Sequence, residues 1–153
     1  MPDFALWPAL ALAALGAVLD IKERRLPNWL CAALFLAAGA GLAFTHGWQM
    51  LPWGLLHAAV ALVIGMGLFA LGAIGGGDAK FYAAAAFSLP AVPLSGPVAF
   101  LGWTSLAGLA VLAAMMVWRR TRSREESRRL FKSWGVPYGV AIAAGLWLTF
   151  LAS

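Results

Sequence analysis

Six apolar segments follow one another along the chain, and they constrain its fold more than any other feature. A helix needs about 20 apolar residues to cross roughly 30 Å of hydrocarbon. Inside a bilayer every backbone polar group must be hydrogen-bonded within the protein, so segments of this kind form helices. The sequence therefore predicts an all-α, polytopic membrane protein with about six transmembrane helices. We place them near residues 4–20, 28–45, 53–74, 79–94, 97–118 and 135–152.

Composition supports a membrane protein and a single domain. Of the 153 residues, 63% are hydrophobic and only 11% are charged, which is more apolar surface than a soluble domain can bury. We interpret residues 1–153 as one integral-membrane domain, because no polar linker divides the chain. The fourth segment is the least regular, since Pro90, Pro93 and Pro97 leave only about a dozen residues of uninterrupted helix before Pro90. A re-entrant segment is the alternative there.

The distribution of basic residues favours six crossings. All 11 lysines and arginines fall in alternate connections: Lys22, Arg24 and Arg25 in the first, Lys80 in the third, and the others within residues 119–132. Cytosolic connections of membrane proteins are enriched in such residues. If the fourth segment did not cross, the two most basic connections would lie on opposite sides. We therefore expect six spans with both termini outside the cytosol, and a short interfacial helix within residues 122–134.

This topology places Asp20 and Asp78 at the same cytosolic face, each at the end of an apolar segment. An ionisable residue at such a position is a candidate functional residue. Two carboxylates that share a site cannot both ionise cheaply, so the pair keeps one proton near neutral pH. A pair of this kind can activate a water molecule and protonate a leaving amine.

The residues before and after Asp78 extend this candidate site. Gly75, Gly76 and Gly77 allow positive φ angles and the close approach of another chain. Lys80 either stabilises the anion of the pair or anchors the helix to lipid phosphates. A purely structural interpretation remains open, in which Asp78 caps the fourth helix and Asp20 is an interfacial charge.

Two motifs resemble those of a known family. Asp20 is followed by Arg24-Arg25-Leu26-Pro27-Asn28, and later come Gly75-Gly76-Gly77-Asp78-Ala79-Lys80. Together they resemble the paired motifs of the type IV prepilin peptidases, membrane aspartic proteases of the GxGD type. The segment that starts at Pro137-Tyr138-Gly139 also resembles the beginning of their last span. The short chain, with its single cysteine, resembles the peptidases of tight-adherence pilus systems and lacks the paired CxxC motifs of larger members.

The resemblance implies an activity, a substrate and a location. Asp20 and Asp78 would form the catalytic pair of an aspartic endopeptidase in the bacterial inner membrane. The enzyme would cleave the basic leader from pilin or pseudopilin precursors at the cytosolic membrane boundary. A non-catalytic scaffold for pilus assembly and a small transporter subunit are the alternatives, although a transporter would favour acids near the bilayer midplane.

The remaining composition bounds the cofactors and partners. Cys31 is the only cysteine and the two histidines have no acidic neighbours, so we expect no metal site and no cofactor. The net charge of +5 is concentrated beside apolar segments, where anionic lipid attracts it. The expected partners are therefore a prepilin substrate and the lipid bilayer, and not nucleic acid. The sequence does not indicate an oligomeric state.

Overall fold

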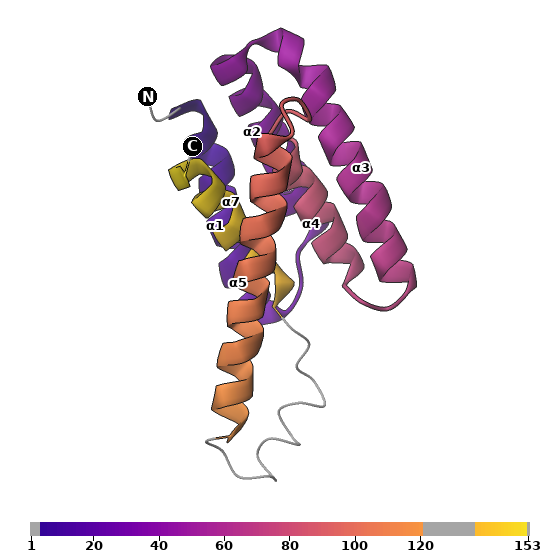
Figure 1. Ribbon diagram of the computed structural model, residues 1–153, viewed down its shortest axis with the longest axis vertical. Coiled ribbons are helices and arrows are strands. Elements are labelled where there is room, and N and C mark those ends of the chain that lie inside the picture. Colours follow the sequence, from indigo (N-terminus) through magenta and orange to yellow (C-terminus); the bar gives the residue numbers. More distant parts are fainter. Residues whose placement is uncertain (1–3, 121–136, 153) are drawn as a thin grey trace.

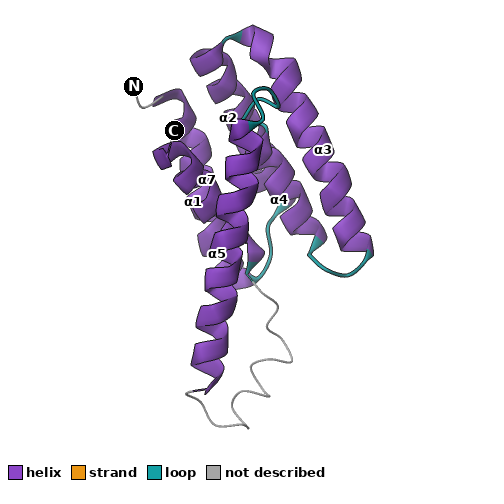
Figure 2. Cartoon of the chain, in the orientation of Figure 1, coloured by secondary structure: helices purple, strands orange, loops and turns teal. Residues whose placement is uncertain are grey.

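The protein is built from helices. The computed structural model describes residues 4–120 and 137–152, and the predicted helix within residues 122–134 lies outside these ranges. Within them there is no strand, which confirms the all-α prediction (Figure 2). Two short 3-10 helices, Phe4–Leu6 and Trp48–Met50, precede α1 and α3. The α-helices are α1 (Trp7–Glu23), α2 (Asn28–His46), α3 (Leu51–Ala70), α4 (Gly76–Ala86), α5 (Ser95–Arg120) and α7 (Tyr138–Ala152).

These helices alternate in direction along the bundle. Figure 1 shows α1, α3 and α5 running one way and α2, α4 and α7 the other, so that α1 begins and α7 ends at the same end of the molecule. The α1–α2 and α3–α4 connections lie together at the opposite end. Residues 22–25 and the glycine run at 75–77 are therefore at one end of the bundle, as the alternating pattern of basic residues predicts.

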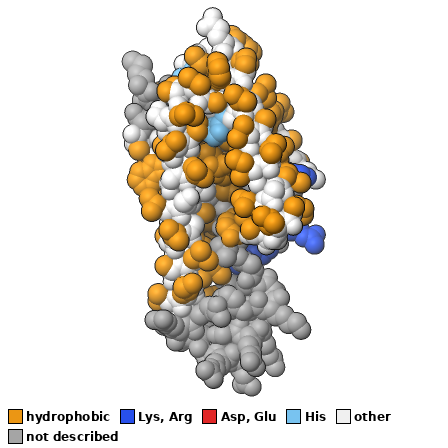
Figure 3. Space-filling view, turned by 45° about the vertical axis from the view of Figure 1, so that its right-hand side comes forward, with side chains coloured by type: hydrophobic (Ala, Val, Ile, Leu, Met, Phe, Trp, Pro, Cys, Tyr) orange, Lys and Arg blue, Asp and Glu red, His pale blue; other side chains and the backbone are white. Residues whose placement is uncertain are grey.

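The outer surface of the bundle is apolar. Four helical segments are long and apolar enough to cross a membrane: Phe4–Glu23, Asn28–His46, Trp48–Ala70 and Ser95–Trp118. On α3 and α5, large hydrophobic side chains face outward, for example Val63 at 73% and Leu109 at 62% exposed. Figure 3 shows hydrophobic side chains spread over the described part of one face. A surface of this kind is stable against lipid and not against water, so this is a multi-pass membrane protein.

Helix α4 is shorter than the predicted fourth span of 79–94. It begins at Gly76 and ends at Ala86, so its 11 residues cover only about 16 Å. Its end comes before Pro90 and Pro93, consistent with the dozen residues of helix expected from the sequence. The chain then continues without helix up to Ser95. Backbone groups of this connection bond to α3, since the Ala91 N–H donates to the Trp53 carbonyl at 3.0 Å.

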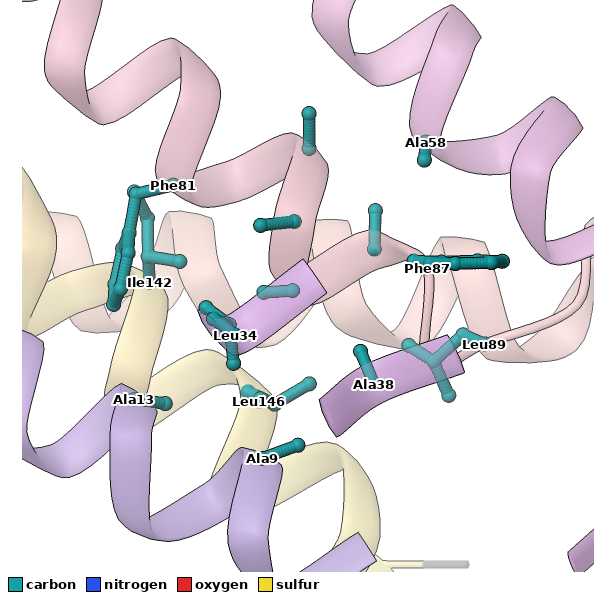
Figure 4. Close-up of a cluster of buried hydrophobic side chains, with 14 of the residues drawn as sticks. Ala9, Ala13, Leu34, Ala38, Ala58, Phe81, Phe87, Leu89, Ile142 and Leu146 are labelled. Atoms are coloured by element: carbon teal, nitrogen blue, oxygen red, sulfur yellow. The ribbon is translucent and has the colours of Figure 1, made fainter. Parts of the chain in front are cut away.

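Small residues let the helices approach closely in the core (Figure 4). Ala9 and Ala13 of α1 pack with Leu34 of α2 and Leu146 of α7 in one buried cluster. Two glycines mark the closest approaches. A Cβ on Gly16 would collide with the ring of Phe81 in α4, and one on Gly145 would collide with Thr104 in α5. The single thiol, Cys31, is buried in this cluster, which agrees with a role in packing.

Candidate active site

Asp20 lies in the last turn of α1, where the helix is about to end. The helix is closed by Arg24, which adopts a left-handed conformation with φ 55° and donates its backbone N–H to the Asp20 carbonyl at 3.2 Å. Pro27 then precedes α2, which begins at Asn28. Asp20 is only 6% exposed, although its side chain is ionisable and it lies close to the end of its helix. A buried carboxylate needs hydrogen-bond partners, so its contacts decide what it can do.

The partner of Asp20 comes from the far end of the sequence. The backbone N–H of Gly139, in the first turn of α7, donates to Asp20 Oδ2 at 2.8 Å, a contact between residues 119 positions apart. This distance is typical of a charge-assisted hydrogen bond. Asp20 is therefore held between α1, which carries it, and the N-terminus of α7.

Asp78 lies in the first turn of α4, outside the four spanning helices. Its Oδ2 accepts the backbone N–H of Gly75 at 3.2 Å, so Asp78 caps the helix from the third helical position while Gly75 occupies the N-cap. Burial is the main cause that raises the pKa of Asp78, to about 6, and the negative charge of Asp20 raises it further against the lowering effect of the Gly75 N–H. This carboxyl group therefore titrates close to neutral pH.

The two carboxylates line the same cavity. It has a volume of about 840 Å³ and is formed by the end of α1, the α1–α2 connection, the α3–α4 connection and the first turns of α4 and α7. The other charged residues in its lining are Glu23, Arg24 and Arg25. Three stretches that are distant in sequence, within residues 20–28, within residues 72–78 and at Tyr138, thus meet around a single space beside Asp20 and Asp78. This space is large enough for an extended segment of peptide.

The glycine run does not use the positive φ angles that its residues allow. None of Gly75, Gly76 and Gly77 has a positive φ; the left-handed glycine of the α3–α4 connection is Gly72, with φ 73°. At Gly75 a Cβ would lie 2.7 Å from Oδ2 of Asp78, so this glycine makes room for a carboxylate of the same protein. The approach of another chain stays a prediction. At Gly77 a Cβ would be 3.6 Å from the Leu26 carbonyl, an ordinary contact. Of the three, Gly75 and Gly77 line the cavity.

Lys80 lies beside the cavity and not in its lining. Its Nζ donates to Oδ1 of Asn28 at 3.2 Å, and Asn28 does line the cavity. Lys80 also borders a separate apolar crevice of about 360 Å³ between α2, α3 and α4. Lys80 thus contacts the lining of the cavity through Asn28, at the N-terminus of α2.

Sequence reasoning did not assign a role to two residues of the site. Gly139 bonds to Asp20, and Tyr138 lines the cavity. The local signal is Pro137, because a proline is favoured at the start of a helix. It does not indicate which residue that helix start contacts. Within residues 4–120 and 137–152, no group of three or more His, Cys, Asp or Glu side chains is arranged to hold a metal ion.

The chemistry of the site is that of two carboxyl groups that line one open cavity. One of them titrates near neutral pH and the other is bonded to a helix N-terminus. This combination can present an acid and a base to one water molecule and one amide bond, which is the requirement for peptide hydrolysis without a covalent intermediate.

Comparison with known proteins agrees with this chemistry. Residues 7–117 match the model of the type IV leader peptidase family. Comparisons with curated proteins and with solved structures give no match. The matched region begins with α1, ends within α5 and includes Asp20, the glycine run and Asp78, whereas α7 lies beyond it. Because the match spans well over half of the 153 residues, the chain belongs to the type IV leader peptidase family, a family of membrane peptidases.

Proposed function

We propose that this protein is an aspartic endopeptidase of the bacterial inner membrane that removes the basic leader from pilin or pseudopilin precursors. Asp20 and Asp78 are its catalytic residues, and cleavage takes place at the cytosolic boundary of the membrane. One observation carries the proposal: both carboxylates line the same cavity of about 840 Å³ at one end of the bundle. Membership of the type IV leader peptidase family supports the class of reaction and substrate.

The reaction needs one ionised and one protonated carboxyl group. The carboxylate takes a proton from water while the water oxygen attacks the scissile carbonyl carbon, and the carboxylic acid gives its proton to the carbonyl oxygen. In the second half the proton gained from water passes to the leaving nitrogen as the C–N bond breaks. The other carboxylate recovers a proton from one hydroxyl of the intermediate. One water is consumed, and both groups return to their starting states.

The position of the cavity fits a substrate that is itself a membrane protein. Lys22, Arg24 and Arg25 lie at this end of the bundle, and connections rich in such residues face the cytosol. A precursor whose apolar segment lies in the bilayer presents its leader at that surface. The scissile bond then reaches the aspartates without moving basic side chains into hydrocarbon.

The proposal predicts that each aspartate is required for cleavage. The purified protein, reconstituted in detergent with a prepilin that carries a basic leader, is expected to release a shortened product. Asp20→Asn and Asp78→Asn should each lower kcat by at least about 10³-fold, because each removes a proton-transfer group. Product is measured by mass spectrometry, which also locates the cut.

Glu23→Gln is the matched control, because it removes a third carboxylate from the same cavity lining. It is expected to cleave at a rate close to that of the wild type. Cleavage that persists after either aspartate is replaced would contradict the two-carboxylate reaction. A wild-type protein that cleaves no prepilin would point instead to a scaffold for pilus assembly.

A further inference from the structure

The first turn of α7 reaches the site through its backbone. The Gly139 N–H that bonds to Asp20 Oδ2 is one of the N–H groups at a helix start that no carbonyl of the same helix accepts. Donating it to a side chain therefore costs the helix no internal hydrogen bond. The N-terminus is also the positive end of the dipole of α7, and the carboxylate of Asp20 lies there. Both effects favour the ionised form of Asp20 over the neutral form.

The contact leaves no room for a side chain at position 139. A Cβ there would lie 2.9 Å from both the Cβ and Oδ2 of Asp20, closer than real Cβ atoms come to other heavy atoms. Gly139 is itself buried. A glycine at this position thus sets the distance between α7 and the carboxylate, and the 2.8 Å hydrogen bond depends on it.

Asp78 has a different environment. Its Oδ2 accepts a longer bond of 3.2 Å from Gly75, at the N-cap of its own helix, and not from the start of another helix. Burial and the charge of Asp20 both favour its neutral form. The remaining titratable groups that line the cavity are Glu23, Arg24 and Arg25 near α1 and Tyr138 of α7.

We propose that Gly139 is a positioning residue for peptide hydrolysis, whose N–H holds Asp20 as an oriented carboxylate. Asp20 is then the base that takes the proton from water, and Asp78 is the acid that protonates the scissile carbonyl oxygen. This inference rests on the proposed function and adds to it a division of roles between the two aspartates. It also adds a residue of α7, which lies outside the region that matches the family.

The decisive variant replaces the N–H by an oxygen atom and adds no side chain. Residue 139 is built from glycolic acid in place of glycine by cell-free synthesis into lipid nanodiscs, which converts its amide to an ester without adding an atom near Asp20. We expect kcat for prepilin cleavage to fall roughly ten- to a hundredfold, the loss typical of a hydrogen bond to a charged group. KM should change little, because Gly139 is buried and does not line the cavity.

The pH profile separates positioning from a general loss of structure. Without the N–H donor the carboxylate of Asp20 is less stabilised, so the acidic limb of kcat/KM against pH should move up by about one to two pH units. The same ester at Gly145 removes a bond inside α7 and is the control for weakened helix structure. It should leave the acidic limb in place.

A second pair of variants tests the steric requirement. Gly139→Ala keeps the N–H but pushes a Cβ against Asp20, so it should lower kcat. Gly102→Ala in α5, where a Cβ meets no atom within 4 Å, should cleave like the wild type. Thermal unfolding in detergent shows whether each variant is folded.

The outcomes are distinct. An ester at position 139 that leaves both kcat and the acidic limb unchanged, in a preparation whose wild type cleaves prepilin, overturns the inference and leaves the proposed function standing. The inference is also overturned if the esters at positions 139 and 145 move the acidic limb of kcat/KM by the same amount. If the wild type cleaves no prepilin, the proposed function itself is wrong.

Discussion

At the scale of single residues, Asp78 destabilises the fold at the pH where it is ionised. Its pKa is raised from 3.8 to about 6, so the folded protein binds this proton more tightly than the unfolded chain does. The contribution of this bound proton to the stability of the folded protein is fully present below about pH 3.8 and is lost as the pH rises through about 6. Enzymes often retain residues at functional sites that lower the stability of the fold.

Replacing this carboxyl group should therefore stabilise the protein in a pH-dependent way. Asp78→Asn removes the ionisation, and its amide oxygen still accepts the Gly75 N–H. We expect its unfolding temperature to exceed that of the wild type by a few degrees at pH 8 and to approach it at pH 4. Thermal unfolding in detergent, followed by circular dichroism, measures both. A difference that is the same at the two pH values would contradict the assigned ionisation.

The sequence identified the residues of this site better than their conformations. Asp20 and Asp78 could be paired because the charge pattern sets the side on which each connection lies. The conformation of Gly75 could not be predicted, since a glycine permits positive φ without requiring it. Gly139 could not be connected to Asp20 at all, because its signal is local and the contact spans 119 positions.

At the scale of elements, the backbone that follows the early end of α4 is not helical, and α3 provides hydrogen-bond partners for it. Non-helical backbone at membrane depth is tolerated only where protein groups satisfy its polar atoms. The connection after Ala86 is bonded in this way: Nδ1 of His57 in α3 lies 3.0 Å from the Leu89 carbonyl oxygen. His57, which has no role in the candidate site, thus has a structural one.

Removing this bond should destabilise the fold and leave the chemistry intact. We expect His57→Leu to lower the free energy of unfolding by about 1–3 kcal/mol, since it leaves a buried carbonyl without a donor. His57→Asn, whose amide nitrogen takes a position close to Nδ1, should restore part of the loss. The measurement is chemical unfolding in detergent micelles.

His46→Leu is the matched control, because the side chain of His46 is exposed and its recorded bond is to the neighbouring Thr45. It should change stability little. Equal losses at positions 46 and 57 would show that the bond to Leu89 is not what stabilises the connection.

The helices themselves could largely be predicted from the apolar segments. Their existence, order and directions follow from hydropathy and the placement of basic residues, and five of the six have bounds close to those expected. The end of α4 was misplaced because an apolar composition continues to Leu94 while the prolines stop the helix at Ala86. Apolar composition indicates where a segment can be buried. Where the helix ends depends on residues such as proline, which lacks a backbone N–H.

At the scale of the whole molecule, the orientation in the membrane is a testable consequence of the charge pattern. In a Cys31→Ala background, Ala73→Cys places an exposed thiol in the α3–α4 connection and Gln49→Cys places one at the opposite end. A membrane-impermeant maleimide added to spheroplasts should label position 49 at once. It should label position 73 only after the membrane is permeabilised. The reverse pattern would place the cavity outside the cytosol.

The path of the chain also sets an order of events during synthesis. Ribosomes make α1 and α4 long before α7, so both aspartates enter the membrane before the N–H that holds Asp20 has been made. Until α7 inserts beside α1, the cavity lacks one of its walls. The finished arrangement around Asp20 therefore forms only when translation of the last helix is nearly complete, and an unfinished chain carries both carboxylates without their final geometry.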